Sequence, residues 1–289
     1  MEREDKGLNI HARRTIAYIV LALVSILCLF WFYVLIINAT RSHSQITMGF
    51  SPVPGTSFLK NWDSLVHGTL PMFAGLRNSV IISVCSAILT TYFSAMTAYG
   101  IHAYRFVGRK AITTFILGVM MIPTQVTALG FIKFIQQPWM TKLHLGMDSY
   151  GPLIIPTIAA PAIFFYMKQY MDSALPMSLV ESARIDGAGE LRTFNSIVLP
   201  IMKPAISVQA IFGFVSSWNN YFTPALVLQT DTKKTLPILI AQLRAADFLK
   251  FDMGQVYMMI LFSIAPVVVV YLILSKQIVG GVAVGAVKG

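Results

Sequence analysis

The segment 181–200 has the residue types and spacing best suited to a specific task. It reads ESARIDGAGELRTFNSIVLP and lies between two long windows without charged residues. Ser178 and Glu181 have the spacing of a capping box, in which each side chain bonds the other residue's backbone amide at the start of a helix. This spacing predicts a short helix from Leu179 to about Asp186.

Gly187 is predicted to end that helix, because glycine adopts the left-handed conformation at little cost. A second helix is predicted to follow and to stop at Leu199-Pro200. Three apolar residues would form one stripe along it: Leu191, Phe194 and Val198. Two short helices at an angle form a projection that fits a groove on another protein. From the residues alone, a docking projection and a plain connector are equally good interpretations.

A second group of polar residues lies in the window 204–230. Their spacing places them on one face of a helix: Gln209, Gly213, Ser216, Asn220 and Thr223. Polar groups in lipid are costly unless they face protein or water. This face therefore lines either a translocation path or a hydrogen-bonded seam between helices.

Membrane-spanning helices must position these residues. Six windows of 19 to 27 residues contain no Asp, Glu, Lys or Arg: 15–38, 78–104, 111–132, 149–167, 204–230 and 253–275. A helix needs about 20 residues to cross the hydrocarbon, and it satisfies its own backbone hydrogen bonds. Only 12% of the chain is charged, against about 25% in soluble domains. We predict an all-α membrane protein with six transmembrane helices.

The distribution of basic residues predicts the orientation of the chain. Six spans place both termini on one side, and thirteen of the 22 basic residues fall on that side, including the cluster in 105–110. Basic residues in short loops favour the cytoplasm. We therefore expect cytoplasmic termini, with 1–14 as the N-terminus and 278–289 as the tail. The transmembrane domain would span 15–277, with the loop of about 173–203 between spans four and five also cytoplasmic.

Details of the spans and loops follow from proline, glycine and length. The first window is longer than the apolar part of a signal peptide, so we expect it to remain as an anchor. Span four contains Pro152, Pro156 and Pro161 and is predicted to be bent or broken. The outer segment 39–76 is expected to hold one short helix. The outer loop 229–252 is expected to carry solvated charges.

No catalytic group, metal site or cofactor site is predicted in this chain. The five histidines are dispersed, and Cys28 and Cys85 lie in apolar windows without a metal-ligand spacing. No phosphate-binding loop of the type Gly-x-x-x-x-Gly-Lys-Ser/Thr is present, so the chain should not hydrolyse ATP. No basic stripe with interleaved aromatic residues argues for nucleic acid.

The segment 181–200 resembles the EAA loop of importer permeases of the ATP-binding-cassette family. That pattern is Glu-Ala-Ala, three residues, Gly, nine residues and Ile-x-Leu-Pro. This chain has it as Glu181, Ser182, Ala183, Gly187, Ile197, Leu199 and Pro200, with Ser182 in place of the first Ala. Asp186 also fits the sugar-permease version. Three further motifs resemble the carbohydrate-uptake branch, as in the smaller maltose-type permease: 121–123, 218–221 and the tail 285–289.

The resemblance implies a bacterial-type inner-membrane permease subunit of a carbohydrate importer. Its partners would be a second related permease, two ATPase subunits that bind ATP and Mg²⁺, an extracytoplasmic sugar-binding protein and membrane lipid. The loop would be the ATPase-coupling element, with Glu181 meeting a basic residue of the ATPase. On this reading Trp218 and Tyr221 are candidates for stacking on a sugar ring, and Asn219 and Asn220 for bonding its hydroxyls. The loop 229–252 is a candidate contact for the binding protein.

Three rival functions make different predictions. An ion-driven secondary transporter requires ionisable groups near the bilayer centre, and the six windows contain none except His102 near a span end. A membrane enzyme or scaffold requires clustered nucleophile, acid and base residues, which the sequence does not show. An importer of a polyol or glycerol phosphate stays open, because the charge of the outer loops does not separate neutral from anionic cargo.

Overall fold

The computed structural model of the chain describes residues 10–245 and 252–286, and beyond residue 275 it describes the backbone alone. Part of the predicted N-terminus, the end of the predicted tail and part of the outer loop 229–252 therefore lie outside the described residues. The predictions made for those parts stay predictions.

The described residues form helices and no strand. Four helical segments are long and apolar enough to cross a membrane: Ala12–Ala39, Met72–Ala103, Gly151–Ala174 and Met253–Ser275. Two sharply bent helix pairs raise the number to 6 if each pair is one span. The all-α membrane class is confirmed, and the predicted six spans are the upper count. The side on which the termini lie stays a prediction.

Contacts within the chain divide it into two units, residues 1–68 with 243–262 and residues 69–242 with 263–289. The first unit contains three helices and the beginning of a fourth: α1 (Ile10–Ala39), α2 (His43–Thr47), α3 (Phe58–Val66) and α16 (Met253–Ala286). The outer segment thus holds two short helices, not the single one predicted. The apolar window of α1 is not buried within the chain, so this helix needs lipid or another protein around it.

Asn61 organises the first unit. Its side-chain amide donates to the carbonyls of Ala39 and Arg41, both at 2.9 Å. The backbone of Gly254 passes so close that a Cβ there would lie 2.7 Å from the Asn61 side chain. The Gln255 amide donates to the Ser64 carbonyl at 2.8 Å. These bonds fix the loops around α2 and α3 to the beginning of α16.

The second unit contains the remaining helical elements. The longer ones are α4 (Met72–Ala103), α5 (Arg109–Val119), α6 (Thr124–Ile135), α9 (Pro161–Ala174), α10 (Met177–Ile185), α13 (Lys203–Trp218) and α15 (Leu236–Arg244), followed by the end of α16. The short ones are α7 (Pro138–Lys142), α8 (Gly151–Ile154), η1 (Ile155–Ile158), α11 (Glu190–Thr193), the π-helical turn η2 (Phe194–Val198), α12 (Leu199–Ile201), α14 (Phe222–Val227) and η3 (Asp231–Lys233).

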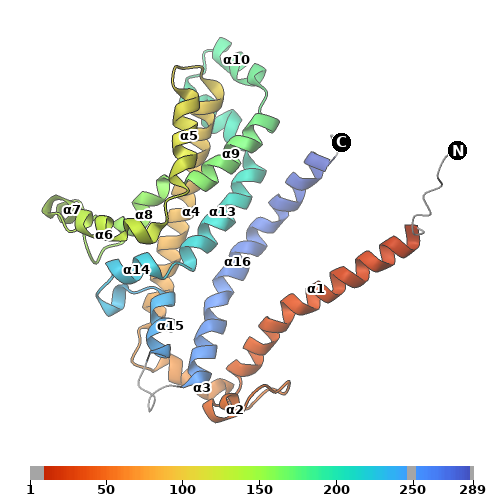
Figure 1. Ribbon diagram of the computed structural model, residues 1–289, viewed down its shortest axis with the longest axis vertical. Coiled ribbons are helices and arrows are strands. Elements are labelled where there is room, and N and C mark those ends of the chain that lie inside the picture. Colours follow the sequence, from red (N-terminus) through yellow and green to blue (C-terminus); the bar gives the residue numbers. More distant parts are fainter. Residues whose placement is uncertain (1–9, 246–251, 287–289) are drawn as a thin grey trace. The chain divides into compact units, whose positions relative to one another are not determined.

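The helix α4 is the centre of this unit and packs along α13 and α9, which lie beside it in Figure 1. Small residues line its packing face and allow the helices to approach closely, among them Ala87, Ala95 and Ala98. α4 also contacts elements near each of its ends, η3 at its beginning and η2 towards its end. At a rise of about 1.5 Å per residue its 32 residues span about 48 Å.

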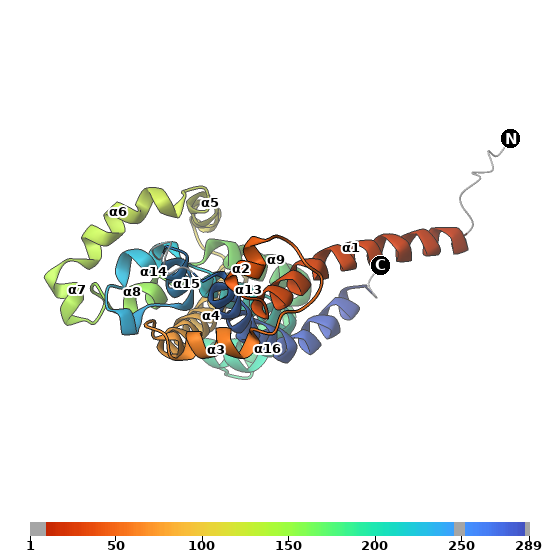
Figure 2. The ribbon, with the colours of Figure 1, turned by 90° about the horizontal axis from the view of Figure 1, so that it is seen from below.

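Three predicted spans are interrupted. The predicted break in span four is confirmed, since the chain leaves helical geometry at Ala159 and Ala160 before Pro161 starts α9. Span three, predicted as one helix, is bent by 96° between α5 and α6, and Figure 2 shows α6 leaving the direction of α5. Pro123 explains this bend, because it has no N–H to continue a helix. Span five is interrupted between α13 and α14.

Candidate functional site

Residues 177–201, which we call the lever, form two short helical segments joined by a turn at Gly187. Gly187 has a φ of 75° and follows the end of α10. Its N–H donates to the Arg184 carbonyl at 3.1 Å, and the Ala188 N–H donates to the Ala183 carbonyl at 2.9 Å. This pair of bonds is the Schellman pattern of helix ends. The predicted conformation of Gly187 is confirmed.

The capping box predicted for Ser178 and Glu181 is wrong. α10 begins at Met177 with Pro176 as its N-cap, and no side chain bonds the first amides. Because Pro176 is the N-cap, Ser178 already lies inside the first turn of the helix and cannot cap it. Glu181 is exposed and has no partner among the described residues. Its carboxylate is therefore available to another molecule.

The lever has one buried and one exposed face. Val180 and Ala183 are buried, whereas Glu181, Ser182 and Asp186 are exposed. Three large apolar side chains are also exposed: Leu179 at 43%, Ile185 at 85% and Leu191 at 66%. The predicted stripe is therefore only partly right, because Phe194 and Val198 are buried while Leu191 points away from them.

The second segment was predicted to stop at Leu199-Pro200, and this prediction is wrong. Helical geometry continues through α12 to Ile201, and the chain then bends by 84° into α13. Pro200 lies in the first turn of α12, directly after the π-helical turn η2, where its missing N–H is tolerated. The Leu199-Pro200 motif thus lies just before the bend, and the bend itself follows Ile201.

Glu190 fastens the lever to α4. One carboxylate oxygen accepts from Arg184 Nε at 2.8 Å, and the other accepts from the Tyr99 hydroxyl at 2.8 Å. The Arg184 guanidinium lies 5.1 Å from the centre of the Tyr104 ring. Charge-assisted bonds of this kind are stronger than neutral ones. We call Tyr99, Arg184 and Glu190 the clasp.

A buried core lies beneath the clasp. It contains Tyr99 from α4, Val180 from α10, and Phe194 and Val198 from η2, together with Met167 and Met171 from α9. The Tyr99 and Phe194 rings are 5.6 Å apart. His102, at the end of α4, bonds Asp172 at 2.9 Å and faces the Leu175 carbonyl at 3.2 Å. The base of the lever is thus packed and bonded to α4 and α9 at once.

The predicted path residues of span five do not share one helical face, because α13 ends at Trp218. Gln209 and Gly213 are buried against neighbouring helices, and Ser216 is exposed. Trp218 is 3% exposed, and its ring stacks on Phe214 at 5.4 Å. Its stacking surface is therefore occupied within the chain.

The remaining path candidates lie at or after the end of α13. Asn219 is exposed, and Tyr221 is 50% exposed. Asn220 accepts from the Thr223 N–H at 3.3 Å through its side-chain oxygen. Asn220 and Thr223 both line a cavity of about 330 Å³ between α6, α8, η1 and α14. The structure thus brings these two predicted path residues together.

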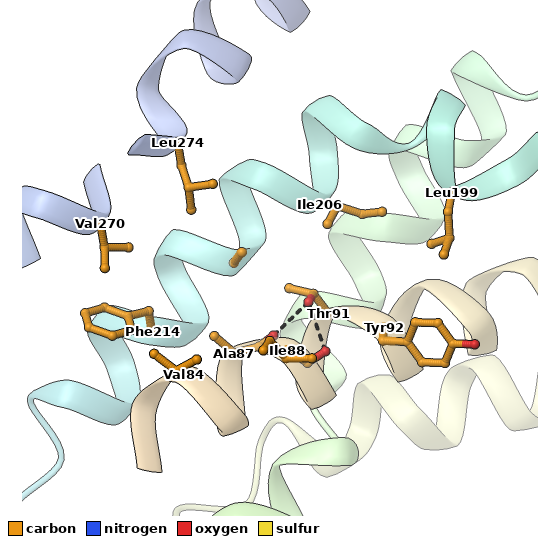
Figure 3. Close-up of a pocket in the computed structure, with 11 residues that line it drawn as sticks. Val84, Ala87, Ile88, Thr91, Tyr92, Leu199, Ile206, Phe214, Val270 and Leu274 are labelled. Carbon is orange, nitrogen blue, oxygen red and sulfur yellow. Dashed lines mark hydrogen bonds between the residues drawn. The ribbon is translucent and has the colours of Figure 1, made fainter. Parts of the chain in front are cut away.

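A different hollow, of about 390 Å³, lies between α4, α13 and α16 (Figure 3). Its lining is apolar, with Val84, Phe214 and Leu274 among the side chains that face it. Its single threonine, Thr91, bonds the Ala87 carbonyl of its own helix at 2.7 Å. Tyr92 also borders this hollow, and its hydroxyl bonds Asn195 Oδ1 at 3.3 Å. Both hydroxyls are thus engaged within the chain.

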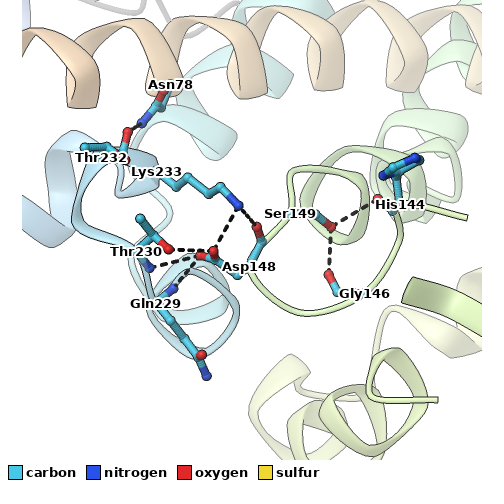
Figure 4. A network of polar contacts seen from close by, with 9 residues as sticks. All are labelled: Asn78, His144, Gly146, Asp148, Ser149, Gln229, Thr230, Thr232 and Lys233. Carbon is cyan, nitrogen blue, oxygen red and sulfur yellow. Dashed lines mark hydrogen bonds and ion pairs between the residues drawn. The ribbon is translucent and has the colours of Figure 1, made fainter. Parts of the chain in front are cut away.

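Asp148 ties two loops together at the beginning of α4 (Figure 4). It accepts from the Gln229 N–H at 2.9 Å, from the Thr230 N–H at 3.0 Å and from the Thr230 hydroxyl at 2.7 Å. Lys233 Nζ lies 2.9 Å from the carboxylate. The Asn78 amide donates to the Thr232 and Lys234 carbonyls at 2.8 and 3.0 Å, which attaches these loops to α4.

The environment of Asp148 keeps it ionised. Partial burial would raise its pKa, but the hydrogen bonds from Thr230, Lys233 and Gln229 outweigh burial and hold the pKa well below its usual range. We call Asp148, Gln229, Thr230 and Lys233 the loop tie. At neutral pH the Asp148 carboxylate is therefore ionised and accepts hydrogen bonds from all of these donors.

The clasp and the loop tie were not predicted from the sequence. Arg184 and Glu190 gave a local signal, since opposite charges flank the Gly187 turn. Tyr99 gave none, because it lies 91 residues from Glu190. Asp148 and Lys233 are 85 residues apart, so local spacing gave no signal for this pair. Such pairs are set by the tertiary fold.

Comparisons with known proteins agree with this architecture. Residues 90–278 match the family described as "Binding-protein-dependent transport system inner membrane component". The chain is 33% identical over 273 residues to the arabinooligosaccharides transport system permease protein AraQ of Bacillus subtilis (strain 168), covering 92% of this chain and 93% of that protein. It is 31% identical over 283 residues to the trehalose/maltose transport system permease protein MalG of Thermococcus litoralis, covering 96% and 98%.

The fold is also found in a solved structure. A crystal structure of a bacterial ABC transporter involved in the import of the acidic polysaccharide alginate superposes with a TM-score of 0.75, covering 94% of this chain and 99% of that chain at 21% identity. The lever with its left-handed glycine and the interrupted spans thus occur in a chain matched over most of its length by transport system permeases. This chain belongs to the family of binding-protein-dependent transport system inner membrane components.

Proposed function

We propose that this chain is one transmembrane half of an ATP-driven importer of sugars or oligosaccharides. The exposed lever on a fixed base supports this function most directly. Its outer face presents Glu181, Ile185 and Leu191 without a partner in the described chain, while its inner face is bonded to α4 through Glu190. An exposed apolar pair beside a free carboxylate is typical of a surface that another protein covers.

In this proposal the lever docks on an ATPase subunit, and Glu181 meets a basic residue there. ATP and Mg²⁺ bind to the two ATPase subunits. A second related permease completes the path, and an extracytoplasmic binding protein delivers the sugar. When the ATPases close, they move both levers, and the clasp passes that movement to α4, so that the helix bundle rotates as a body.

The names of the relatives support sugars as the cargo. AraQ is named for arabinooligosaccharides and MalG for trehalose and maltose. Both align with this chain over nearly its whole length, which supports the same task for this subunit. Polyols and glycerol phosphate are the competing cargo class.

Copurification tests the assembly. The tagged chain would be extracted from its native membrane in mild detergent, and the accompanying proteins identified and counted by mass spectrometry. We expect one related permease and two copies of an ATPase. A stable chain that purifies alone would contradict the importer assembly and favour an ion-driven transporter.

A further inference from the structure

We propose that the cavity between α6, α8, η1 and α14 is a binding site for one neutral, hydroxyl-bearing sugar unit of the cargo, an inference that rests on the proposed function. Three chain interruptions border this cavity or lie beside it. Thr124 follows the bend after α5, Thr157 precedes the break before α9, and Asn220 lies in the break after α13. Interrupted helices leave backbone groups unpaired, and within a membrane these are tolerated where protein covers them or where they face a water-filled cavity.

The side chains that line the cavity can bond hydroxyl groups. The hydroxyls of Thr127 and Thr157 donate to the carbonyls of Thr124 and Ile154 at 3.0 and 2.6 Å, so each oxygen still has a lone pair to accept with. Asn220 accepts from Thr223 through its oxygen, and its NH₂ has no partner among the described residues. The lining thus offers both acceptors and donors, as a sugar hydroxyl requires.

Two aromatic side chains complete the lining. Phe131 comes from α6 and Phe222 from α14, and both face the same cavity as the threonines. Aromatic rings provide the apolar surface on which the C–H faces of a sugar ring pack. At about 330 Å³ the cavity lies at the small end of ligand pockets, which run from about 300 to 1,000 Å³. Its size therefore suits a single unit and not a long oligomer.

The charge of the lining favours a neutral cargo. None of the described residues that line this cavity is charged. A phosphate or carboxylate held there would lose hydration without gaining a cation, which is costly. The cations Arg105, Arg109 and Lys110 border a separate hollow directly after the end of α4. The cavity therefore discriminates against glycerol phosphate and acidic sugars.

Uptake by cells that produce the complete importer tests this site. The probes are radiolabelled maltotriose, arabinotriose and galactotriose as neutral sugars, with sn-glycerol 3-phosphate and an alginate trisaccharide as anions. We expect uptake of at least one neutral probe. Thr127→Val together with Thr223→Val should lower its maximal rate about tenfold, because each lost hydroxyl removes about threefold. The half-saturating concentration, set by the binding protein, should stay within twofold.

Thr113→Val is the matched control. The Thr113 hydroxyl also donates to a carbonyl of its own helix, Arg109 at 2.9 Å, but it does not line the cavity. This variant should keep the wild-type rate. Equal rates for the double variant and this control would overturn the site, and uptake restricted to the anions, or absent for every neutral probe, would overturn the neutral assignment.

The variant Thr127→Trp distinguishes two interpretations of the cavity: a binding site for the solute, or a packing surface for the second permease. A bulky side chain that fills the cavity should abolish uptake while the second permease and the ATPase still copurify. Loss of the second permease from the complex would show that a partner helix occupies the cavity, and the site would be rejected. If no ATPase copurifies with the wild-type chain, the proposed function itself is refuted. That result differs from loss of uptake by an intact complex and from loss of the second permease.

Discussion

The two ends of α4 are held in different ways. At its beginning, Asn78 donates to the backbone of the loop 228–235, and Asp148 bonds backbone amides and Lys233 there. At its end, Tyr99 bonds a side chain of the lever and packs in a core of aromatic and methionine residues. Apolar side chains pack at both ends, with Ile82 and Val227 in the core at the first. The polar bonds differ: those at the first end go mainly to backbone, and those at the second go mainly to side chains.

This difference indicates a different role for each end. Bonds to backbone hold two loops in one arrangement, which suits a fixed rim. Packed side chains under an exposed projection let the lever move as a unit with α4, because cores transmit displacement with little compression. Exposed Ile185 and Leu191 at that end leave a surface for a partner. Variants in the lever, the clasp and the loop tie test this contrast.

Gly187→Pro should have the largest effect. Proline fixes φ near −65°, whereas Gly187 has φ of 75° and donates its N–H to Arg184. The turn of the lever cannot form, so uptake should fall at least tenfold while the chain still inserts into the membrane. Radiolabelled uptake, normalised to membrane-inserted protein, measures this.

Gly108→Pro provides the control for that variant. Gly108 also has a positive φ, 90°, but lies in the short turn before α5, outside the lever. Its uptake should stay within threefold of wild type. Similar losses in both variants would point to general misfolding, and normal uptake by Gly187→Pro would refute the lever as the coupling element.

Glu190→Gln should uncouple the lever from α4. The amide still accepts from Tyr99, but the charge that Arg184 pairs with is lost. Because both partners are about one-third exposed or more, with 34% and 41% of their side chains accessible, the stability change should be about 1 kcal/mol at most. ATP hydrolysed per sugar imported should rise severalfold in the reconstituted complex.

Asp63→Asn is the matched charge loss. Asp63 pairs with His67 on a surface where both side chains are more than 70% exposed. Neither coupling nor stability should change. An unchanged ratio of ATP to sugar in Glu190→Gln would show that the clasp only stabilises the fold.

Asp148→Asn should change the pH dependence of stability. The pKa of Asp148 lies below its usual value in the folded chain, so the folded state binds fewer protons than the unfolded state at low pH. Its contribution is present in full above the unfolded pKa of about 4 and is lost as pH falls towards the folded pKa. The melting temperature of wild type should exceed that of the variant by a constant margin from pH 5 to 8, and this margin should shrink below pH 4.

Asp231→Asn is the comparison for the loop tie. Asp231 pairs with Lys234 in the same loop, but its side chain is 70% exposed. Its melting temperature should follow wild type at every pH. If the difference in melting temperature between wild type and Asp148→Asn grew in acid, the loop tie would not depend on an ionised Asp148.

Trp218→Phe should have the smallest effect on transport. Trp218 is buried and stacked on Phe214, so the change leaves a small void and should cost about 1–2 kcal/mol of stability. The choice among sugars should be unchanged, because its ring does not line the cavity of α6 and α14. Uptake competition among the three neutral trisaccharides measures this choice, with the exposed Tyr221→Phe as control. A changed preference among the trisaccharides would indicate that Trp218 contacts the sugar after all.

Much of the fold could be predicted from local patterns. Windows without charge predicted the spans, because desolvating a charge in lipid is costly wherever the helix packs. Gly187 predicted its turn, since left-handed backbone favours glycine whatever surrounds it. The prolines of span four predicted its break. The bends in spans three and five were missed, because a charge-free window shows that a segment can lie in the membrane but not that it is straight.

The sequence by itself determined which segments are apolar, where the lever turns and the family to which this chain belongs, since each depends on composition or on neighbours within a few residues. The tertiary structure decided that Glu190 meets Tyr99, that Asp148 meets Lys233, and that Thr127, Thr157 and Asn220 line one cavity. These contacts join residues tens of positions apart. Helix packing and helix bends bring such residues together, and neither can be read from local spacing.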